Sequence, residues 1–349
     1  MSIRDIPGFA RTVLGVKSAA VRAILLIAMA ANGLAQADQS SLFPVEQAGK
    51  YGYIDSHGAI VIPFQFDYAS DFSEGLAKVE VGEECGYINT AGEMVIAPRY
   101  DFLHSEDFSE GLAQAGESRK NGYIDTTGKM VIPATFFSTG KFSEGLAKVS
   151  PTPTVSGFID KAGKFVVPAV YDGFVCDFHE GVACVQKAGK YGFVDKTGRI
   201  AVALQYEQAF DFSEGLAPAE RNGKWGFIDH AGRYIIPLQF DLAWSFEEGL
   251  APVRLNGKWG FVNKSGEWAI VAQFDEVTGF GDGLAAIRVG KKWGFIRRDG
   301  TYAIKPRFED AFYFANGLAQ IRIGARYALV DTEGTIIWKW DEDDDLYTD

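Results

Sequence analysis

Short runs in which every second residue is apolar follow one another along most of the chain, separated by polar turn sequences. In the unit around Trp259 these runs read GLAPVRL, KWGFVN and EWAIVAQF. Alternation with a period of two is typical of half-buried β-strands, so each unit is expected to form three antiparallel strands. A connection that contains Phe-x-x-Gly then leads to the next unit.

Three sequence marks repeat at intervals of 34 to 36 residues. The first is an aromatic residue followed by Gly, clearest as Trp225-Gly226 and Trp259-Gly260. The second is a four-residue turn that ends in Gly, and the third is FSEGLA or a variant of it. Repetition of several marks in one register indicates a repeat architecture.

The turn sequences carry recognisable chemistry. The four-residue turn opens with Asp or Asn in eight of nine copies, as in DSHG and NKSG. Such a side chain caps the turn backbone, and the final Gly adopts the left-handed conformation. NGK before the Trp, clearest at Asn222-Gly223 and Asn256-Gly257, predicts a two-residue hairpin.

The Trp-Gly pair leaves one face of its strand without a side chain at Gly, and this raises the question of what packs there. In a strand, Trp225 and Phe227 point to one face, and Gly226 and Ile228 point to the other. Glycine within a strand marks a bulge or close backbone approach. We expect a Phe ring of a neighbouring connection to lie over the bare Gly. We also expect Trp and Phe to fill the layer between units, because one unit cannot bury such a face alone.

Units of the form NGKWGFID followed by IP, FD and FSEGLA resemble the WG (KWG) β-repeat of bacterial proteins. The resemblance covers about residues 42–340, with eight full units and a partial ninth. It implies tandem β-hairpin units and no particular activity, and its members are generally presumed to mediate interactions. The fold class is therefore all-β, with about nine three-stranded meanders. Variable copy number favours an open solenoid or superhelix, and a closed β-propeller-like ring is the alternative.

Residues 1–37 have the features of a secretory signal peptide. A basic stretch precedes the apolar run AILLIAMAANGLA, and AQA at residues 35–37 has the small-x-small form of a cleavage site. The run is shorter than the roughly 20 apolar residues of a membrane span. We therefore expect cleavage near Ala37 and a periplasmic or extracellular protein without a transmembrane segment. Residues 38–340 form the repeat array, and residues 341–349 form an acidic tail.

Charge narrows the choice of partner. The formal net charge is -12, so the chain is expected to repel nucleic acid on average. Residues 288–326 are an exception, with nine basic residues against three acidic ones. This segment could hold an acidic polysaccharide or could be a solvated edge balanced by the acidic body.

Departures from the repeat are better functional candidates than the recurring Asp and Glu residues, because a residue that every turn requires is structural. Insertions in repeat proteins tend to lie on one face, often the binding face. Residues 101–108, which include His104, are two residues longer than their counterparts. Residues 171–178, which include Cys176, and the Pro-rich stretch near Pro151 are each one residue longer.

The sequence CDFHEGVAC places Cys176, His179 and Cys184 close together. The spacing matches no familiar zinc pattern and lacks a fourth ligand, so no metal site is assigned. In an exported protein a Cys176–Cys184 disulfide is possible, and two unpaired thiols are the alternative. Cys85 replaces a signature aromatic residue and is expected to be buried.

The sequence names no catalytic residue, no cofactor and no defined binding residue. We infer a non-enzymatic exported scaffold that binds an unknown protein or a cell-envelope glycan. The alternative is a glycan-active enzyme built on the repeats. A scaffold should show dispersed surface features, whereas an enzyme should show one deep pocket lined by carboxylates that interrupt the pattern.

Overall fold

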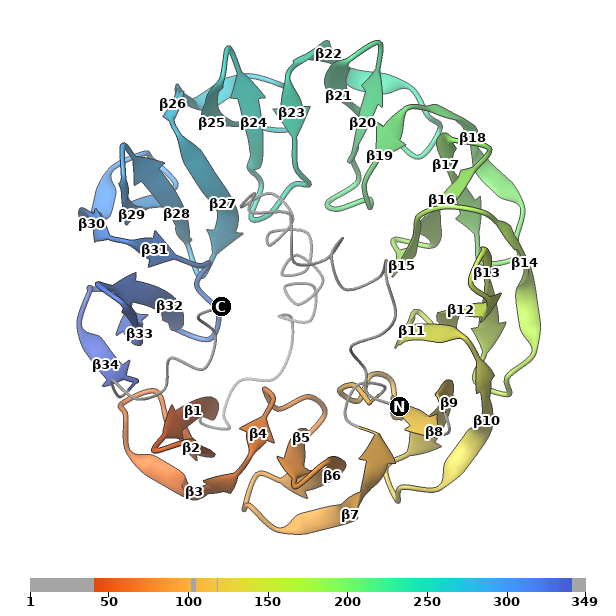
Figure 1. Ribbon diagram of the computed structural model, residues 1–349. Helices are drawn as coiled ribbons and strands as arrows, with labels where there is room; N and C mark the ends of the chain where they lie inside the picture. Colours follow the sequence, from red (N-terminus) through yellow and green to blue (C-terminus); the bar gives the residue numbers. More distant parts are fainter. Residues whose placement is uncertain (1–40, 102–104, 118, 341–349) are drawn as a thin grey trace, which may run out of the picture. The chain divides into compact units, whose positions relative to one another are not determined.

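A computed structural model of the chain describes residues 41–101, 105–117 and 119–340. These residues form a closed ring of nine antiparallel blades, a β-propeller, with no helix in the described part (Figure 1). The all-β prediction is confirmed. Of the two architectures considered, the closed ring is correct and the favoured open solenoid is wrong. The expected signal peptide, the acidic tail and His104 lie outside the described residues.

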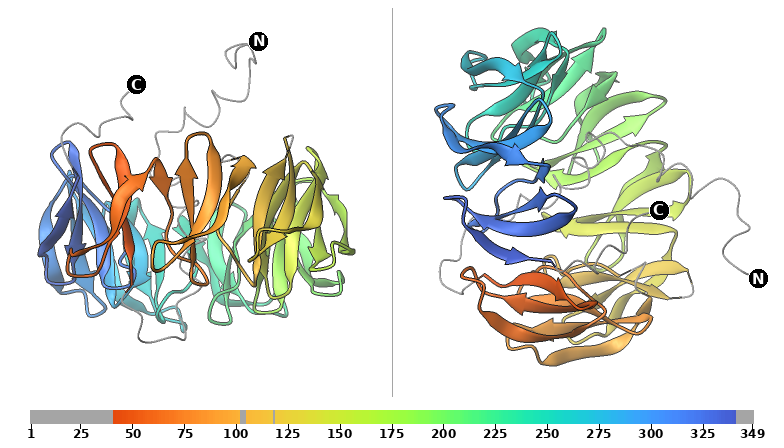
Figure 2. Two further views of the ribbon diagram at one scale, coloured as in Figure 1. Left: turned by 90° about the horizontal axis from the view of Figure 1, so that it is seen from below. Right: turned by 60° about the vertical axis from the view of Figure 1, so that its left-hand side comes forward.

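The blades follow one another in chain order around the ring, and the ring is flat when seen edge-on (Figure 2). Seven blades have a described inner strand next to the centre. These strands are β4 (Tyr68–Ala69), β11 (Ser138–Ser143), β15 (Val175–His179), β19 (Gln208–Ala209), β23 (Leu242–Ala243), β27 (Glu276–Gly281) and β31 (Asp310–Ala311). The second strands are β1 (Phe43–Gln47), β5 (Leu76–Val81), β8 (Leu112–Glu117), β12 (Leu146–Thr152), β16 (Val182–Lys187), β20 (Ala217–Arg221), β24 (Ala251–Leu255), β28 (Leu284–Val289) and β32 (Leu318–Ile323).

The third strand of each blade carries the aromatic-Gly mark, and the outer strand forms the rim. The third strands are β2 (Lys50–Ile54), β6 (Glu84–Asn89), β9 (Lys120–Asp125), β13 (Val155–Asp160), β17 (Lys190–Asp195), β21 (Lys224–Ile228), β25 (Lys258–Val262), β29 (Lys292–Arg297) and β33 (Arg326–Asp331). The outer strands are β3 (Ile60–Phe66), β7 (Met94–Asp101), β10 (Met130–Phe136), β14 (Phe165–Tyr171), β18 (Ile200–Tyr206), β22 (Tyr234–Phe240), β26 (Trp268–Phe274), β30 (Tyr302–Phe308) and β34 (Ile336–Lys339).

Most blades have four strands, where the sequence predicted three. The extra strand lies in the connection before Phe-x-x-Gly and in several blades is only two residues long, as in β19 and β23. A two-residue strand is too short to produce a periodic pattern, which is why the sequence shows a loop there. Blades 1 and 3 have three described strands each, and β7 continues into β8 through the Asp101–Gly116 pair.

The turn predictions are confirmed. Asp55 Oδ1 accepts hydrogen bonds from the backbone N–H groups of His57 and Ala59, and Gly58 has φ of 87°. The Ala59 hydrogen bond, followed by that of His57, holds the pKa of Asp55 below its ordinary value. Asn222 and Gly223 both have positive φ, as a type I′ hairpin requires.

The strands place two kinds of connection on opposite faces of the ring. The two-residue hairpins and the connections between blades lie on one face, here called the hairpin face. The four-residue turns and the Phe-x-x-Gly connections lie on the other, here called the turn face. This follows from the antiparallel order of the strands within every blade.

The predicted partner of the bare glycine is wrong, although the predicted strand faces are correct. Opposite Gly226, the outer strand carries two extra residues between Ile236 and Phe240. This bulge brings the backbone so close that a Cβ on Gly226 would lie 2.5 Å from the Ile236 carbonyl oxygen. The glycine therefore accommodates the backbone of its own blade and not a ring from a neighbour. All eight aromatic-Gly copies show the same close approach.

The ninth blade confirms this explanation. Ala328 stands where the other copies have Gly, and its outer strand has no bulge at this position. Ala328 pairs with Lys339 and Leu329 pairs with Trp338 without interruption. A residue with a Cβ at this position and a bulge in the outer strand opposite it thus do not occur together in this chain.

Apolar layers between neighbouring blades form the core. Trp225 and Phe227 pack toward blade 7, whereas Ile228 packs toward blade 5. One such layer lies at each of the nine boundaries, and the last joins Leu318 and Leu329 of blade 9 to Val45 and Ile54 of blade 1. This layer closes the ring.

An aromatic pair crosses each of the eight boundaries from blade 1/2 to blade 8/9. The Phe of the Phe-x-x-Gly connection contacts the aromatic residue that follows Gly in the preceding blade, with ring centroids 4.7–4.9 Å apart. Phe227–Phe246 and Phe295–Phe314 are examples. Edge-to-face or tilted pairs of this kind add about 0.5–1.5 kcal/mol each beyond area burial.

Substituting Gly226→Ala should destabilise the protein by about 1–3 kcal/mol, because the new Cβ must push the bulge of β22 outward. Urea unfolding followed by circular dichroism measures the change. Ala328→Gly is the matched control and should cost less than about 1 kcal/mol, the backbone entropy of glycine. Equal stability of Gly226→Ala and the native chain would contradict the bulge explanation.

Candidate functional site

The Glu of the FSEG mark has a structural role. Each of these carboxylates accepts a hydrogen bond from the backbone of the same mark in the next blade, at 2.7–3.3 Å. The series comprises Glu74, Glu110, Glu144, Glu180, Glu214, Glu248 and Asp282. We call this the turn-face contact. The recurring Glu and Asp residues of this mark therefore stabilise the packing of neighbouring blades.

Basic side chains of the four-residue turns join this contact. In four consecutive blades the second turn residue binds the Glu of the preceding blade. The pairs are Lys161–Glu110 at 3.2 Å, Lys196–Glu144 at 2.9 Å, His230–Glu180 at 3.1 Å and Lys264–Glu214 at 3.0 Å. His230 also stacks on the ring of Phe212. These basic side chains therefore take part in contacts between blades.

A second carboxylate contact holds the hairpin face. Asp67, which directly follows an outer strand, pairs with Lys50 of its own unit and accepts the N–H of Gly82 in the next hairpin. The same arrangement recurs at Lys258–Asp275–Gly290 and Lys292–Glu309–Gly324. Lys224 bonds Asp241 at 2.7 Å and lowers the pKa of that carboxyl. We call this the hairpin-face contact.

The hairpin-face contact is missing between blades 3 and 4. In blades 1 to 8, seven of the eight residues that follow the last aromatic residue of the outer strand are Asp or Glu, and the exception is Phe137. The hairpin that should donate to it contains Pro153 at the position of Gly82, and proline has no N–H. The acceptor and the donor have therefore been lost together. The hairpin-face contact therefore places no requirement on the residues at positions 137 and 153.

Two of the three insertions lie beside this boundary on the same face. The extra residue near Pro151 forms a bulge in β12, next to the hairpin of blade 4. The extra residue at the entry to blade 5 is Gly173, where a Cβ would fall 1.9 Å from the Gln186 side-chain oxygen. The connection that contains the third insertion enters blade 3, also on the hairpin face, but residues 102–104 lie outside the described part.

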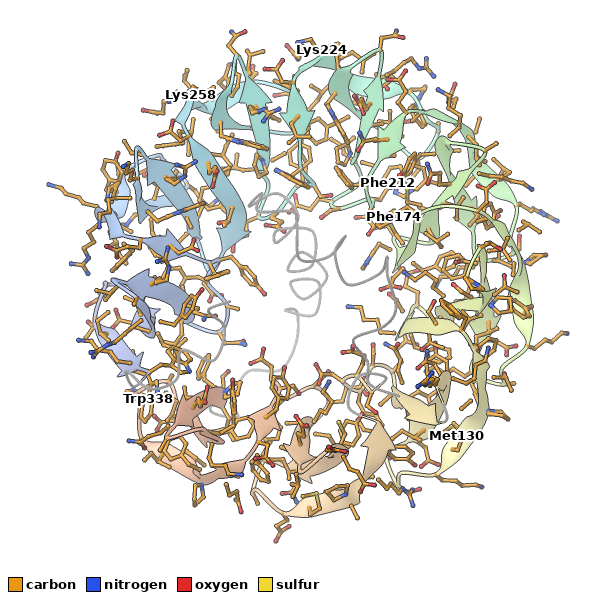
Figure 3. The ribbon with its side chains drawn as sticks, viewed as in Figure 1. Met130, Phe174, Phe212, Lys224, Lys258 and Trp338 are labelled. Atoms are coloured by element: carbon orange, nitrogen blue, oxygen red, sulfur yellow. The ribbon has the colours of Figure 1, made fainter. Side chains whose placement is uncertain are left out.

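The insertion at Gly173 exposes an aromatic residue. Phe174 lies on the inner side of the ring, as Figure 3 shows, and 45% of its surface is exposed. Its N–H donates to Gln186 Oε1, and its carbonyl accepts the Gln186 N–H. Nearby, Val170 is 43% exposed where the other full copies have Gln, Arg or Thr. Phe137 is 45% exposed.

We call this region the insertion surface. It consists of Phe137, Val170 and Phe174 together with Arg119 and Lys120 of blade 3 and the hairpins of blades 4 and 5. Phe137 lies at the entry to blade 4, Val170 near the end of its outer strand and Phe174 at the entry to blade 5.

The hairpins of this surface carry cations. Arg119, Lys120, Lys187 and Lys190 are exposed and have no ion pair among the described residues. In four other blades the lysine equivalent to Lys120 binds the carboxylate 17 positions later. Here position 137 is the Phe that replaced that carboxylate.

The cysteines predicted as a possible disulfide are neighbours. Cys176 on β15 and Cys184 on β16 are buried free thiols, with registered pairs on either side of them. A hydrogen bond with Cys184, together with burial, raises the pKa of Cys176. The disulfide remains a prediction. Cys85 is buried, as expected.

Two carboxylates near these thiols are poorly solvated. Asp177 Oδ1 and Asp211 Oδ1 are buried without a hydrogen-bond partner, although 34% of the Asp211 side chain is exposed. Burial raises the pKa of Asp211 to about 6. His179 Nε2 lies 3.9 Å from Asp211 Oδ2. Within the described residues no three His, Cys, Asp or Glu side chains are placed to hold a metal ion.

The basic segment 288–326 does not form one surface. Lys291 and Lys292 belong to the hairpin face, whereas Arg297 and Arg298 belong to the turn face. Arg288 is paired with Glu276 and Lys292 with Glu309, both at 2.6 Å. Part of the positive charge of this segment is therefore neutralised by neighbouring carboxylates.

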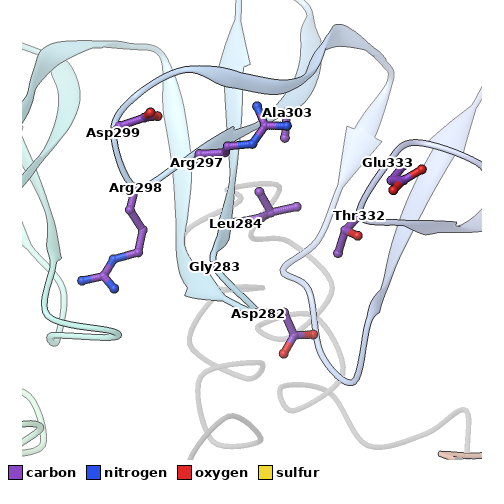
Figure 4. A pocket seen from close by; sticks show the side chains of 9 residues that line it. All are labelled: Asp282, Gly283, Leu284, Arg297, Arg298, Asp299, Ala303, Thr332 and Glu333. Carbon is purple, nitrogen blue, oxygen red and sulfur yellow. The ribbon is translucent and has the colours of Figure 1, made fainter.

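Arg297 and Arg298 line an open depression between blades 8 and 9 with a volume of about 600 Å³ (Figure 4). Arg297 takes the place of the usual turn Asp and donates to the Tyr302 carbonyl, and Asp299 caps Thr301 instead. Asp282, already bonded to Gly317, and Glu333 offset the two cations. The depression is shallow and mixed in charge.

Sequence reasoning found the insertions but missed Phe137, Pro153 and Val170. The sequence did contain a signal for these residues. Aligning the repeats position by position shows that Phe137 and Val170 are apolar where the other repeats have polar residues. The sequence alone does not show that Phe137 and Pro153 occupy the two sides of one contact, because that depends on which hairpin lies against each connection in the folded chain.

The two thiols should form the Cys176–Cys184 disulfide when the protein is exported. They would lose two protons and two electrons to a disulfide oxidant. Peptide mapping without reduction should give a cross-linked Cys176–Cys184 pair, in the native chain and in a Cys85→Ser control. Recovery of both cysteines as free thiols from exported protein would refute this.

Stability should fall as pH rises because of Glu247. Burial, followed by the nearby Glu248 and Glu214, raises its pKa from 4.5 to about 7. The folded state thus binds the proton more tightly, and the stabilisation present below pH 4.5 is lost as pH rises through 7. Glu247→Gln should remove about 1–3 kcal/mol of this pH dependence, measured by urea unfolding between pH 5 and 8. A native pH profile in Glu247→Gln would contradict this prediction.

Comparison with solved structures finds chains of similar fold. The crystal structure of a eukaryotic initiation factor aligns with a TM-score of 0.61 at 10% identity, covering 87% of this chain and 98% of that chain. BamB from Moraxella catarrhalis aligns with a TM-score of 0.43 at 12% identity, covering 84% and 92%. Hsv2p from Kluyveromyces lactis aligns with a TM-score of 0.42 at 8% identity, covering 67% and 94%.

No curated protein matches the sequence. Among the described residues, no helix has the length and apolar character needed to cross a membrane. The family model of the WG containing repeat matches eight times, at residues 51–85, 86–116, 122–150, 157–191, 191–225, 225–259, 259–293 and 293–327. These matches span most of the chain, and the protein belongs to the WG containing repeat family.

Proposed function

We propose that this protein is an exported, non-enzymatic scaffold that binds a protein or a cell-envelope glycan through the insertion surface. The observation that carries the proposal is the convergence of departures from the repeat. Phe137, Pro153, Val170 and Gly173-Phe174 interrupt the pattern at consecutive units and lie on one face. Repeated polar residues, by contrast, are used in contacts between blades.

Exposed aromatic residues on such a surface are typical anchors of binding interfaces. Phe137 and Val170 would be costly to keep in water at positions where the other copies carry polar residues. Their retention is explained by a partner that covers them. The basic and apolar character of residues 1–37 supports the proposal of export.

The proposal is tested with the full mature chain, used as bait on envelope extracts and on a glycan array. A specific binder should be recovered by the native chain and lost by the double variant Phe137→Asp/Phe174→Ser. Val289→Asp is the control, because Val289 is 46% exposed on the hairpin face of blade 8. Equal recovery by both variants would exclude the insertion surface.

The enzyme alternative makes a different prediction in the same experiment. A glycan-active enzyme would change the mass of an array ligand during incubation, whereas a scaffold would release it unchanged. Mass measurement of the exported protein also tests whether the mature chain begins after Ala37.

A further inference from the structure

The insertion surface combines apolar side chains with unpaired cations in a protein whose net charge is -12. We propose that it binds an acidic segment of a partner protein, one in which carboxylates alternate with apolar side chains. This inference rests on the proposed scaffold function and specifies the partner's chemistry.

The two aromatic residues are held rigidly. Phe137 donates its N–H to the Ser150 carbonyl, and its own carbonyl accepts Asn121 Nδ2. Phe174 is bonded through both backbone groups to Gln186. Because the backbone is fixed before binding, little ordering entropy is lost when a partner covers the rings.

The cations around these rings make no ion pair with the carboxylates of the repeat. Lys120 faces the position where Phe137 replaces an acid. Lys190 makes no ion pair with Glu207 among the described contacts; Glu207 accepts the N–H of Gly223, and Asp172 accepts the N–H of Ala188. The four basic side chains can therefore bind a carboxylate from outside, beside the exposed Asp172 and Glu207.

A polypeptide fits this chemistry better than a glycan. Sugar hydroxyl groups need both acceptors and donors beside an aromatic platform. At Phe137 and Phe174 the backbone groups already bond within the protein, and the side chains without a partner among the described residues are cationic donors, whereas the nearby carboxylates of Asp172 and Glu207 already accept hairpin N–H groups. Carboxylates spaced between apolar side chains match cations spaced between Phe137, Val170 and Phe174.

The experiment measures fluorescence polarisation of a short labelled peptide of alternating Glu and Leu with the full mature chain. The analogue with Gln for Glu and a labelled polygalacturonate are compared. The acidic peptide should bind roughly tenfold more tightly than the Gln analogue, and more tightly than polygalacturonate.

Three substitutions return the surface to the pattern of the other blades, so they are expected to fold. Phe137→Asp, Val170→Gln and Phe174→Ser should each weaken peptide binding, the Phe variants by roughly tenfold. Lys120→Gln combined with Lys190→Gln should reduce the salt dependence of binding. Val289→Asp should bind like the native chain, and thermal unfolding confirms that every variant is folded.

Equal affinity for the acidic and Gln peptides, tight binding of polygalacturonate alone, or binding unaffected by Phe137→Asp and Phe174→Ser would overturn the inference. If the peptide fails to bind but Phe137→Asp/Phe174→Ser still abolishes recovery of the envelope binder, the scaffold function stands and only the acidic partner is wrong. If recovery is also unaffected, both are wrong.

Discussion

The structure depends on the fact that one blade cannot bury either of its faces. Each third strand points aromatic residues toward the next blade and an aliphatic residue toward the previous one. Every blade therefore contributes to two apolar layers, one on each of its sides. Phe227 is covered by Phe246, and Ile228 lies in the layer with Phe193 of blade 5. Closing the ring gives the first and last blades the same cover as the others, which an open array would leave in water.

The Trp-Gly mark is a consequence of this packing. The outer strand must bulge to bring Ile236 into the layer, and the bulge brings backbone against Gly226. Ala328 in the last blade lies opposite a part of the outer strand that has no bulge, so sequence and geometry change together. The glycine is therefore required by the covalent chain of its own blade and needs no ligand or neighbouring ring to explain it.

Strands, turns and the two faces of the third strand could be predicted because they follow from local alternation and turn chemistry. Ring closure could not, because it depends on the angle between blades accumulated over nine copies. The inner strands were missed since a pair such as Leu242 and Ala243 has no period. At the candidate site, chain length revealed the insertion at Gly173, but the loss of contact between Phe137 and Pro153 appears only when the hairpin opposite each connection is known.

The blade 3/4 boundary also shows how a repeat ring can lose a contact on one face without losing its fold. It lacks the hairpin-face contact, but Glu110 still binds the Gly145 N–H, and Lys161 still pairs with Glu110. Tyr123 and Phe142 remain 4.9 Å apart in a fully apolar layer. One exposed hydrogen-bonded contact contributes about 1 kcal/mol, whereas burying a single large apolar side chain contributes about 1.5–3 kcal/mol. The layer and the turn-face contact therefore suffice to hold the boundary, and the side chains released on the hairpin face are free to change toward recognition.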